Sequence, residues 1–91
     1  MPEISRFLGI SIWMYRDDHL PPHFHAIYNE FGAQKFGAQI SIRNPGIIEG
    51  RLPPRVLGYV IEWASMHDDD LARCWDAAQT DLPIGKIAPL I

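Results

Sequence analysis

The feature that most constrains the fold is a change in the spacing of apolar residues at Pro53-Pro54. Before this pair, apolar and polar residues alternate along the chain, as they do in strands that bury one face. After it, apolar residues recur at helical spacing, at Val56, Leu57, Val60, Ile61 and Ala64. Because proline suits the first turn of a helix, the pair predicts where that helix begins. The pattern predicts an α+β fold in which the helices follow the strands.

The chain before this switch predicts an antiparallel meander of three to four strands. We expect one long strand over residues 4–15, a second over about 23–28, a third over about 34–43 and a short fourth over 47–51. Two C-terminal helices should pack on one sheet face. We expect the first to break near His67, with Asp68 as the N-cap of the second. The apolar residues of the segment 81–91 predict that it packs against the fold.

Length and composition narrow the class of protein. The chain has 91 residues, of which 47% are apolar, and we expect residues 1–91 to form one domain. No apolar run approaches the roughly 18 residues of a membrane span, and the N-terminus has no signal-peptide pattern. A single cysteine, Cys74, excludes an internal disulfide and fits a reducing compartment, so we expect a cytoplasmic protein. A net charge of −3 disfavours nucleic acid as the partner.

Three of the four histidines lie within the segment 17–25, Asp-Asp-His-Leu-Pro-Pro-His-Phe-His. His23 and His25 are two positions apart on the predicted second strand, so both side chains should project from one face. Two imidazoles in this arrangement can bind one metal ion, and zinc is the first candidate. We take His19, His23 and His25 as the candidate ligands. Asp17, Asp18 and His67 are open alternatives for the third position.

The alternation also predicts which face carries these histidines. Phe24 and its apolar neighbours two and four positions on should face the core, so His23 and His25 should point away from the helices. If the first two strands pair, Trp13 and Tyr15 lie beside them. The predicted binding surface is therefore aromatic and titratable, and its members are Trp13, Tyr15, His19 and Pro22.

Several functions fit this surface. The first is a protein-interaction module that binds a small partner or a second copy of itself. The second is a histidine-dependent hydrolase or nuclease, with or without a metal ion, in which His23 and His25 act as ligands or as the acid–base pair. A third is nucleic-acid binding through Trp13, Tyr15, Lys35 and Arg43. The sequence pattern leaves open whether the chain is an enzyme.

A set of short motifs resembles one small bacterial family, the domain-of-unknown-function family 4160. The most specific of them is Pro21-Pro22-His23-Phe24-His25. The others are Pro2-Glu3-Ile4-Ser5-Arg6-Phe7, Gly9-Ile10, Met14-Tyr15, Asp18-His19, Ile48-Glu49-Gly50, Leu52-Pro53, Glu62-Trp63-Ala64, His67, Trp75 and Lys86-Ile87-Ala88-Pro89-Leu90. The resemblance implies a compact bacterial cytoplasmic protein. It also implies a partner protein encoded nearby, a second small domain of unknown function (family 2442), in a toxin–antitoxin-like pair. It implies no established activity.

Overall fold

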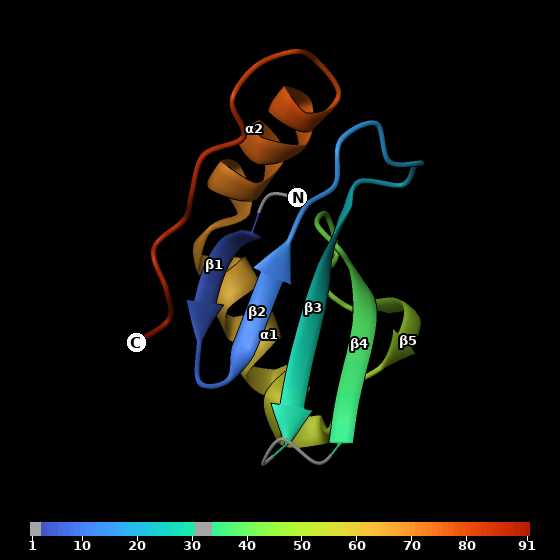
Figure 1. The fold of residues 1–91 in the computed structure, drawn as a ribbon, viewed down its shortest axis with the longest axis vertical. Coiled ribbons are helices and arrows are strands. Elements are labelled where there is room, and N and C mark those ends of the chain that lie inside the picture. Colours follow the sequence, from blue (N-terminus) through green and yellow to red (C-terminus); the bar gives the residue numbers. More distant parts are fainter. Residues whose placement is uncertain (1–2, 31–33) are drawn as a thin grey trace.

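Five strands form one antiparallel sheet in the computed structural model, which describes residues 3–30 and 34–91. The strands follow one another in space in their order along the chain, so the sheet is a simple meander (Figure 1). Their bounds are β1 (Glu3–Phe7), β2 (Ile10–Trp13), β3 (His23–Glu30), β4 (Gln34–Ser41) and β5 (Ile47–Arg51). Two helices follow, α1 (Pro54–Met66) and α2 (Asp68–Ala78). The α+β prediction is confirmed, with one more strand than the upper number expected.

The additional strand comes from a tight turn within residues 4–15, which the sequence analysis treated as one strand. Leu8 and Gly9 both have positive φ, 52° and 76°, and the residues on either side, Phe7 and Ile10, face each other across the hairpin. Positive φ at both central residues is typical of the two-residue turn that matches the twist of paired strands. Leucine rarely adopts this conformation, so the residue type gave no sign of a turn, and the continued alternation was interpreted as one strand.

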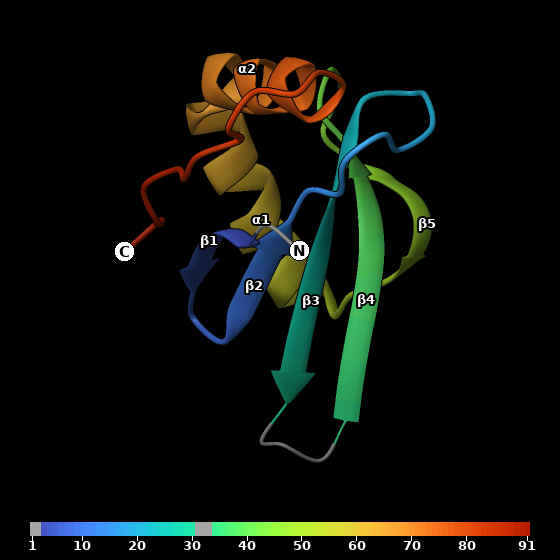
Figure 2. The same cartoon turned by 45° about the horizontal axis from the view of Figure 1, so that its top comes forward.

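Helix α1 covers one face of the sheet, and α2 lies across the end where the β2–β3 loop emerges (Figure 2). The break between them falls at His67, as expected, but His67 itself is the N-cap and Asp68 is the first helical residue. Asp68 instead accepts a hydrogen bond from the backbone N–H of Asp69 through Oδ1. The first turn of α2 holds three aspartates, whose negative charges are stabilised by the positive end of the helix dipole.

The core lies between the helices and one face of the sheet. Trp63 of α1 is fully buried at its centre, with its ring 5.5 Å from that of Phe7 and 5.7 Å from that of Phe24. The predicted core face of β3 is confirmed, because Phe24 and the alternate residues after it are buried. None of the helices in the described residues has the length and apolar character that a membrane span requires.

The C-terminal segment packs against the fold, as its apolar residues predict. The backbone N–H of Ile87 donates to the carbonyl of Ile4 at 2.8 Å, which places the segment beside β1 (Figure 1). The indole N–H of Trp63 donates to the carbonyl of Ala88 at 2.8 Å. Ile84 and Ile87 are buried. The segment therefore extends the core and covers one edge of the sheet.

Cys74 of α2 is fully buried, and its thiol donates to the carbonyl of Ile84 at 3.4 Å. Burial raises the pKa of this thiol, despite the opposing charge of the neighbouring Arg73. The folded protein therefore keeps the proton to a higher pH than the unfolded chain does. Stability from this group is present below the ordinary thiol pKa and declines as the pH rises above it.

We expect Cys74 to react with iodoacetamide at least about a hundredfold more slowly in the native protein than in denaturant, because the thiolate is scarce and shielded. Alkylation followed by mass spectrometry measures this rate. The Cys74→Ala variant is the control, and it should also lose the alkaline decline in stability. Equal rates with and without denaturant would contradict the burial of this thiol.

Candidate metal centre

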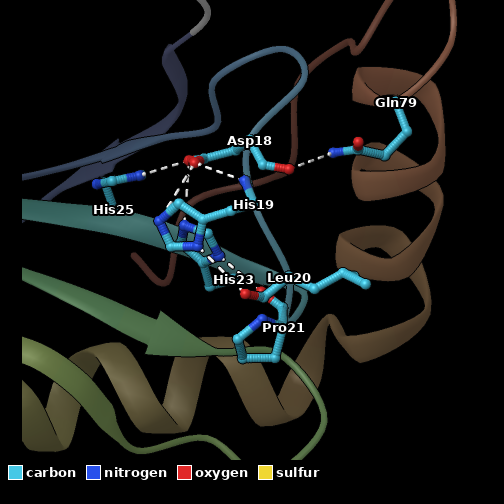
Figure 3. A network of polar contacts seen from close by, with 7 residues as sticks. All are labelled: Asp18, His19, Leu20, Pro21, His23, His25 and Gln79. Carbon is cyan, nitrogen blue, oxygen red and sulfur yellow. Dashed lines mark hydrogen bonds and ion pairs between the residues drawn. The ribbon is translucent and has the colours of Figure 1, made fainter.

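Asp18, His23 and His25 converge at the end of the sheet beneath the β2–β3 loop, and we call them the Asp-His-His cluster (Figure 3). Each offers one ligand atom, and these atoms lie within 4.8 Å of one another. Asp18 Oδ2 lies 3.1 Å from His23 Nε2 and 3.0 Å from His25 Nε2. Among the described residues this is the one group of three or more with ligand atoms so close.

The tautomer of His23 is determined by a backbone carbonyl. Its Nδ1 lies 2.7 Å from the carbonyl oxygen of Pro21, and a carbonyl only accepts, so Nδ1 carries the hydrogen. In the neutral ring, Nε2 then directs a lone pair at the carboxylate of Asp18. That contact is repulsive unless the ring is charged or a cation lies between the two groups. Histidines that bind metals commonly donate their second N–H to a carbonyl in this way.

Asp18 is held in its charged form. Burial acts to raise the pKa of this carboxyl, but the hydrogen bonds from His25 and from the backbone N–H of His19 outweigh it, together with the charges of His23 and His25. The pKa of Asp18 therefore lies below its usual value, and at neutral pH the cluster contains a carboxylate. An ionised carboxylate is the form that coordinates a metal.

The spacing of the cluster is close to that of a metal site. Ligands at 2.0–2.1 Å from a tetrahedral zinc ion lie roughly 3.3 Å from one another. The distances from Asp18 Oδ2 to His25 Nε2 and to His23 Nε2, 3.0 and 3.1 Å, fall a few tenths of an ångström short of this. Withdrawal of the carboxylate by this amount would give both Asp18–histidine pairs the separation of zinc ligands.

The two strand histidines differ in environment, which the sequence analysis did not anticipate. His23 was expected to point away from the helices, but its side chain is fully buried, with its ring 5.4 Å from that of Trp75 in α2. Alternation placed it on the open face, and α2 reaches around the end of the sheet to cover it. His25 retains 22% of its side-chain exposure.

Of the other predicted site residues, some lie beside His25, one stands at the rim of the cluster and one contributes only its backbone. Tyr15 packs edge-on against His25, with ring centroids 4.5 Å apart, and Trp13 is the β2 neighbour of His25 in the sheet. His19 has 67% of its side chain exposed and lies 3.7 Å from Asp18 Oδ1, so it stands at the rim of the cluster rather than within it. Pro22 has a backbone role, because its carbonyl accepts from the N–H of Ile42.

Three candidates lie away from the cluster. His67 packs against Trp63 and faces Asp70 at 3.6 Å, so its ring is committed to the helix junction. Lys35 lies opposite Asn29 in the β3–β4 ladder, near the end of β3 that is remote from His23. Arg43 follows the opposite end of β4. The structure therefore does not bring Lys35 and Arg43 together as one basic patch.

The loop that carries Asp18 is attached to the C-terminus of α2, a connection that the sequence analysis missed. The Arg16 guanidinium donates to three carbonyls, those of Ala77 at 3.4 Å, Thr80 at 3.0 Å and Leu82 at 2.8 Å. The backbone N–H of Asp17 donates to Ala78, and the amide of Gln79 donates to the carbonyl of Asp18. A cation at a helix C-terminus also complements the dipole. No local pattern in the sequence signals these contacts.

We therefore expect Arg16→Ala to lower the affinity of the candidate site for a metal ion about tenfold, because the loop of Asp18 loses its anchor, and to lower the free energy of unfolding by about 1 kcal/mol. Arg16→Lys should not restore the affinity, because the single nitrogen of an ammonium cannot contact three carbonyls as the planar guanidinium does. Cobalt titration and urea unfolding measure the two effects separately. Full metal affinity in Arg16→Ala would show that Asp18 is positioned without this contact.

Comparison with known proteins agrees with the resemblance in the motifs. The family model for the domain of unknown function DUF4160 matches residues 9–76, which include the whole Asp-His-His cluster. The chain belongs to this family. No curated protein matches it. No solved structure matches it either.

Proposed function

We propose that this protein is a metal-dependent hydrolase whose single transition-metal ion, zinc in the first place, is held by the Asp-His-His cluster. The observation that carries the proposal is the hydrogen bond from His23 Nδ1 to Pro21, which directs Nε2 at a carboxylate that stays ionised. Two histidines and one carboxylate form a donor set typical of catalytic zinc and non-haem iron.

The accessibility of the cluster supports a catalytic rather than a structural ion. Structural zinc sites have four protein ligands, whereas catalytic sites have three and keep a position for water or substrate. The cluster has three, and Asp18 and His25 keep 17% and 22% of their side-chain exposure. A bound zinc ion would supply Lewis acidity and a water that ionises near neutral pH.

His19 is the residue we assign to proton transfer. Its ring lies 5.1 Å from that of His23 and is largely exposed, so it can exchange protons with solvent at the rim. His23 is buried and hydrogen-bonded to Pro21, so we assign it the role of a metal ligand with a fixed orientation instead. The proposed reaction class is hydrolysis of an ester, amide or phosphodiester, in which His19 accepts or donates the proton.

Metal analysis tests the proposal directly. Untagged protein purified without chelator should contain about one equivalent of zinc or bind one equivalent of cobalt with the visible spectrum of a tetrahedral site. Asp18→Asn and His25→Ala should each lose it. His67→Ala, which removes a histidine outside the cluster, is the matched control and should retain it. Absence of metal binding in the parent protein, or unchanged binding in both variants, would refute the site.

Activity is tested after loading. Zinc-loaded protein should hydrolyse p-nitrophenyl acetate or bis-p-nitrophenyl phosphate, and His25→Ala should not. His19→Ala should keep its zinc but lose about 10²–10⁴-fold in rate, the usual contribution of a general acid–base group. A loaded protein that turns over neither substrate would contradict hydrolysis of these classes while leaving the metal site in place.

A second proposal is an interaction module of a two-protein, toxin–antitoxin-like system in the bacterial cytoplasm. The exposed edge strand β5 supports it, because Ile47 and Ile48 are 38% and 43% exposed there. An uncovered edge can pair with another strand. Light scattering of the protein alone and with the small protein encoded beside it tests this. A dimer or a complex supports the proposal, and a monomer in both samples contradicts it.

A further inference from the structure

A groove of about 260 Å³ lies on the open face of the sheet and begins at His25. It runs across β3, β4 and β5, on the side away from α1. Its lining residues include His25, Gly37, Gln39, Glu49 and Gly50. Because His25 belongs both to the groove and to the Asp-His-His cluster, one end of the groove adjoins the cluster.

The groove exists because Gly37 has no side chain. Alternation along β4 puts Gly37 on the open face, since Ala38 beside it is buried in the core. A Cβ built on Gly37 would meet nothing nearer than the carbonyl of Ala26 at 4.0 Å, so the sheet has room for a side chain there. The glycine is therefore not required by backbone packing at this position, and its effect is to leave the hollow open.

Gly50 closes the far side of the groove for a different reason. Its φ is +89°, and a Cβ built on it would lie 2.3 Å from the carbonyl oxygen of Gly37. Only glycine lets β5 approach β4 so closely with this backbone conformation. The close approach brings Glu49 to the wall of the groove opposite His25.

Glu49 supplies the only carboxylate of the groove lining. Its side chain is exposed, and no lysine or arginine among the described residues forms an ion pair with it. The ladder aligns His25 with Gln39 and Gln39 with Glu49, so the backbone of Glu49 lies two strand spacings, about 10 Å, from that of His25. Between them Gln39 offers an amide that can donate and accept.

We infer that the groove binds a ligand with a metal-coordinating group at one end and a cationic group, an amine or guanidinium, about 10 Å away. This rests on the proposed metal site and specifies its substrate class: a carbonyl or phosphoryl compound on an aliphatic stem with a positive terminus. The stem lies along Gln39, beside the hollow that Gly37 leaves open, and the cation pairs with Glu49.

Two hydroxamates of equal stem length test the inference on the zinc-loaded protein. We expect 6-aminohexanohydroxamic acid to bind about two- to fivefold more tightly than hexanohydroxamic acid, the range for an exposed ion pair. Glu49→Gln should reduce this ratio to about one, and raised salt should reduce it as well. Isothermal titration calorimetry measures both affinities.

Gly37→Val tests the location. It should weaken both hydroxamates at least about tenfold, because its side chain fills the groove, while zinc content and unfolding midpoint stay at parental values. Equal affinity of the two probes in the parent protein, or undiminished binding to Gly37→Val, would overturn the inference. A chain that holds no zinc would overturn the proposed function first, and this inference with it.

Discussion

Replacing His23 by alanine is expected to abolish metal binding and to lower the free energy of unfolding by about 2–4 kcal/mol. The side chain is fully buried against Trp75, so its removal leaves a cavity. It also leaves the carbonyl of Pro21 without its hydrogen bond. Loss of a ligand should exceed the tenfold to hundredfold effect typical of outer-shell residues. Urea unfolding of the metal-free protein and cobalt titration measure the two quantities.

His25→Ala is the matched variant, because His25 contacts the same oxygen of Asp18 but is partly exposed. It should lose the metal to the same extent and cost less than about 1 kcal/mol of stability, as partly exposed substitutions generally do. The contrast separates a ligand that also builds the core from one that only binds. Similar stability losses in the two variants would mean that the end of the sheet is less tightly packed than the structure has it.

Trp63→Ala is expected to have the largest effect on stability, about 3–5 kcal/mol, as for other buried tryptophans. Trp63 is fully buried, packs against Phe7 and Phe24, and ties the C-terminal segment to α1 through Ala88. Since small domains have a total stability of about 5–15 kcal/mol, much of the fold's stability depends on this residue. Urea unfolding followed by circular dichroism measures it.

Two variants accompany this measurement. Trp63→Phe should recover most of the stability and fall short by about 1–2 kcal/mol, the cost of the hydrogen bond to Ala88 and of lost volume. Leu82→Ala, at a site 61% exposed, should change stability by less than about 0.5 kcal/mol. A Trp63→Ala variant as stable as Leu82→Ala would mean that the core is centred elsewhere.

The two layers of the fold have separate roles in the proposed activity. The helical layer determines the geometry of the metal ligands, because α2 covers His23 and its C-terminus holds the loop of Asp18 through Arg16. The open face of the sheet provides the space for a ligand, because Gly37 leaves a hollow next to His25. Substitutions in the groove should therefore change ligand selectivity without changing metal content.

Much of the architecture is determined by the sequence itself, because alternation and helical spacing are properties of near neighbours along the chain. They predicted the order of strands and helices, the start of α1, the core face of β3 and the packing of the C-terminal segment. The spacing of His23 and His25 placed two candidate ligands on one strand for the same local reason. Asp18 was one of several open choices for the third ligand.

Only the tertiary structure decided the rest. Asp18 lies beside the two histidines because Arg16 and Gln79 join its loop to a helix about sixty residues further along the chain. His23 is buried because Trp75 of that helix covers the end of the sheet. The turn at Leu8 requires a conformation that leucine rarely adopts, and hairpin closure imposes it. The placement of Asp18 and the burial of His23 depend on contacts between distant segments, which neighbouring residues do not encode.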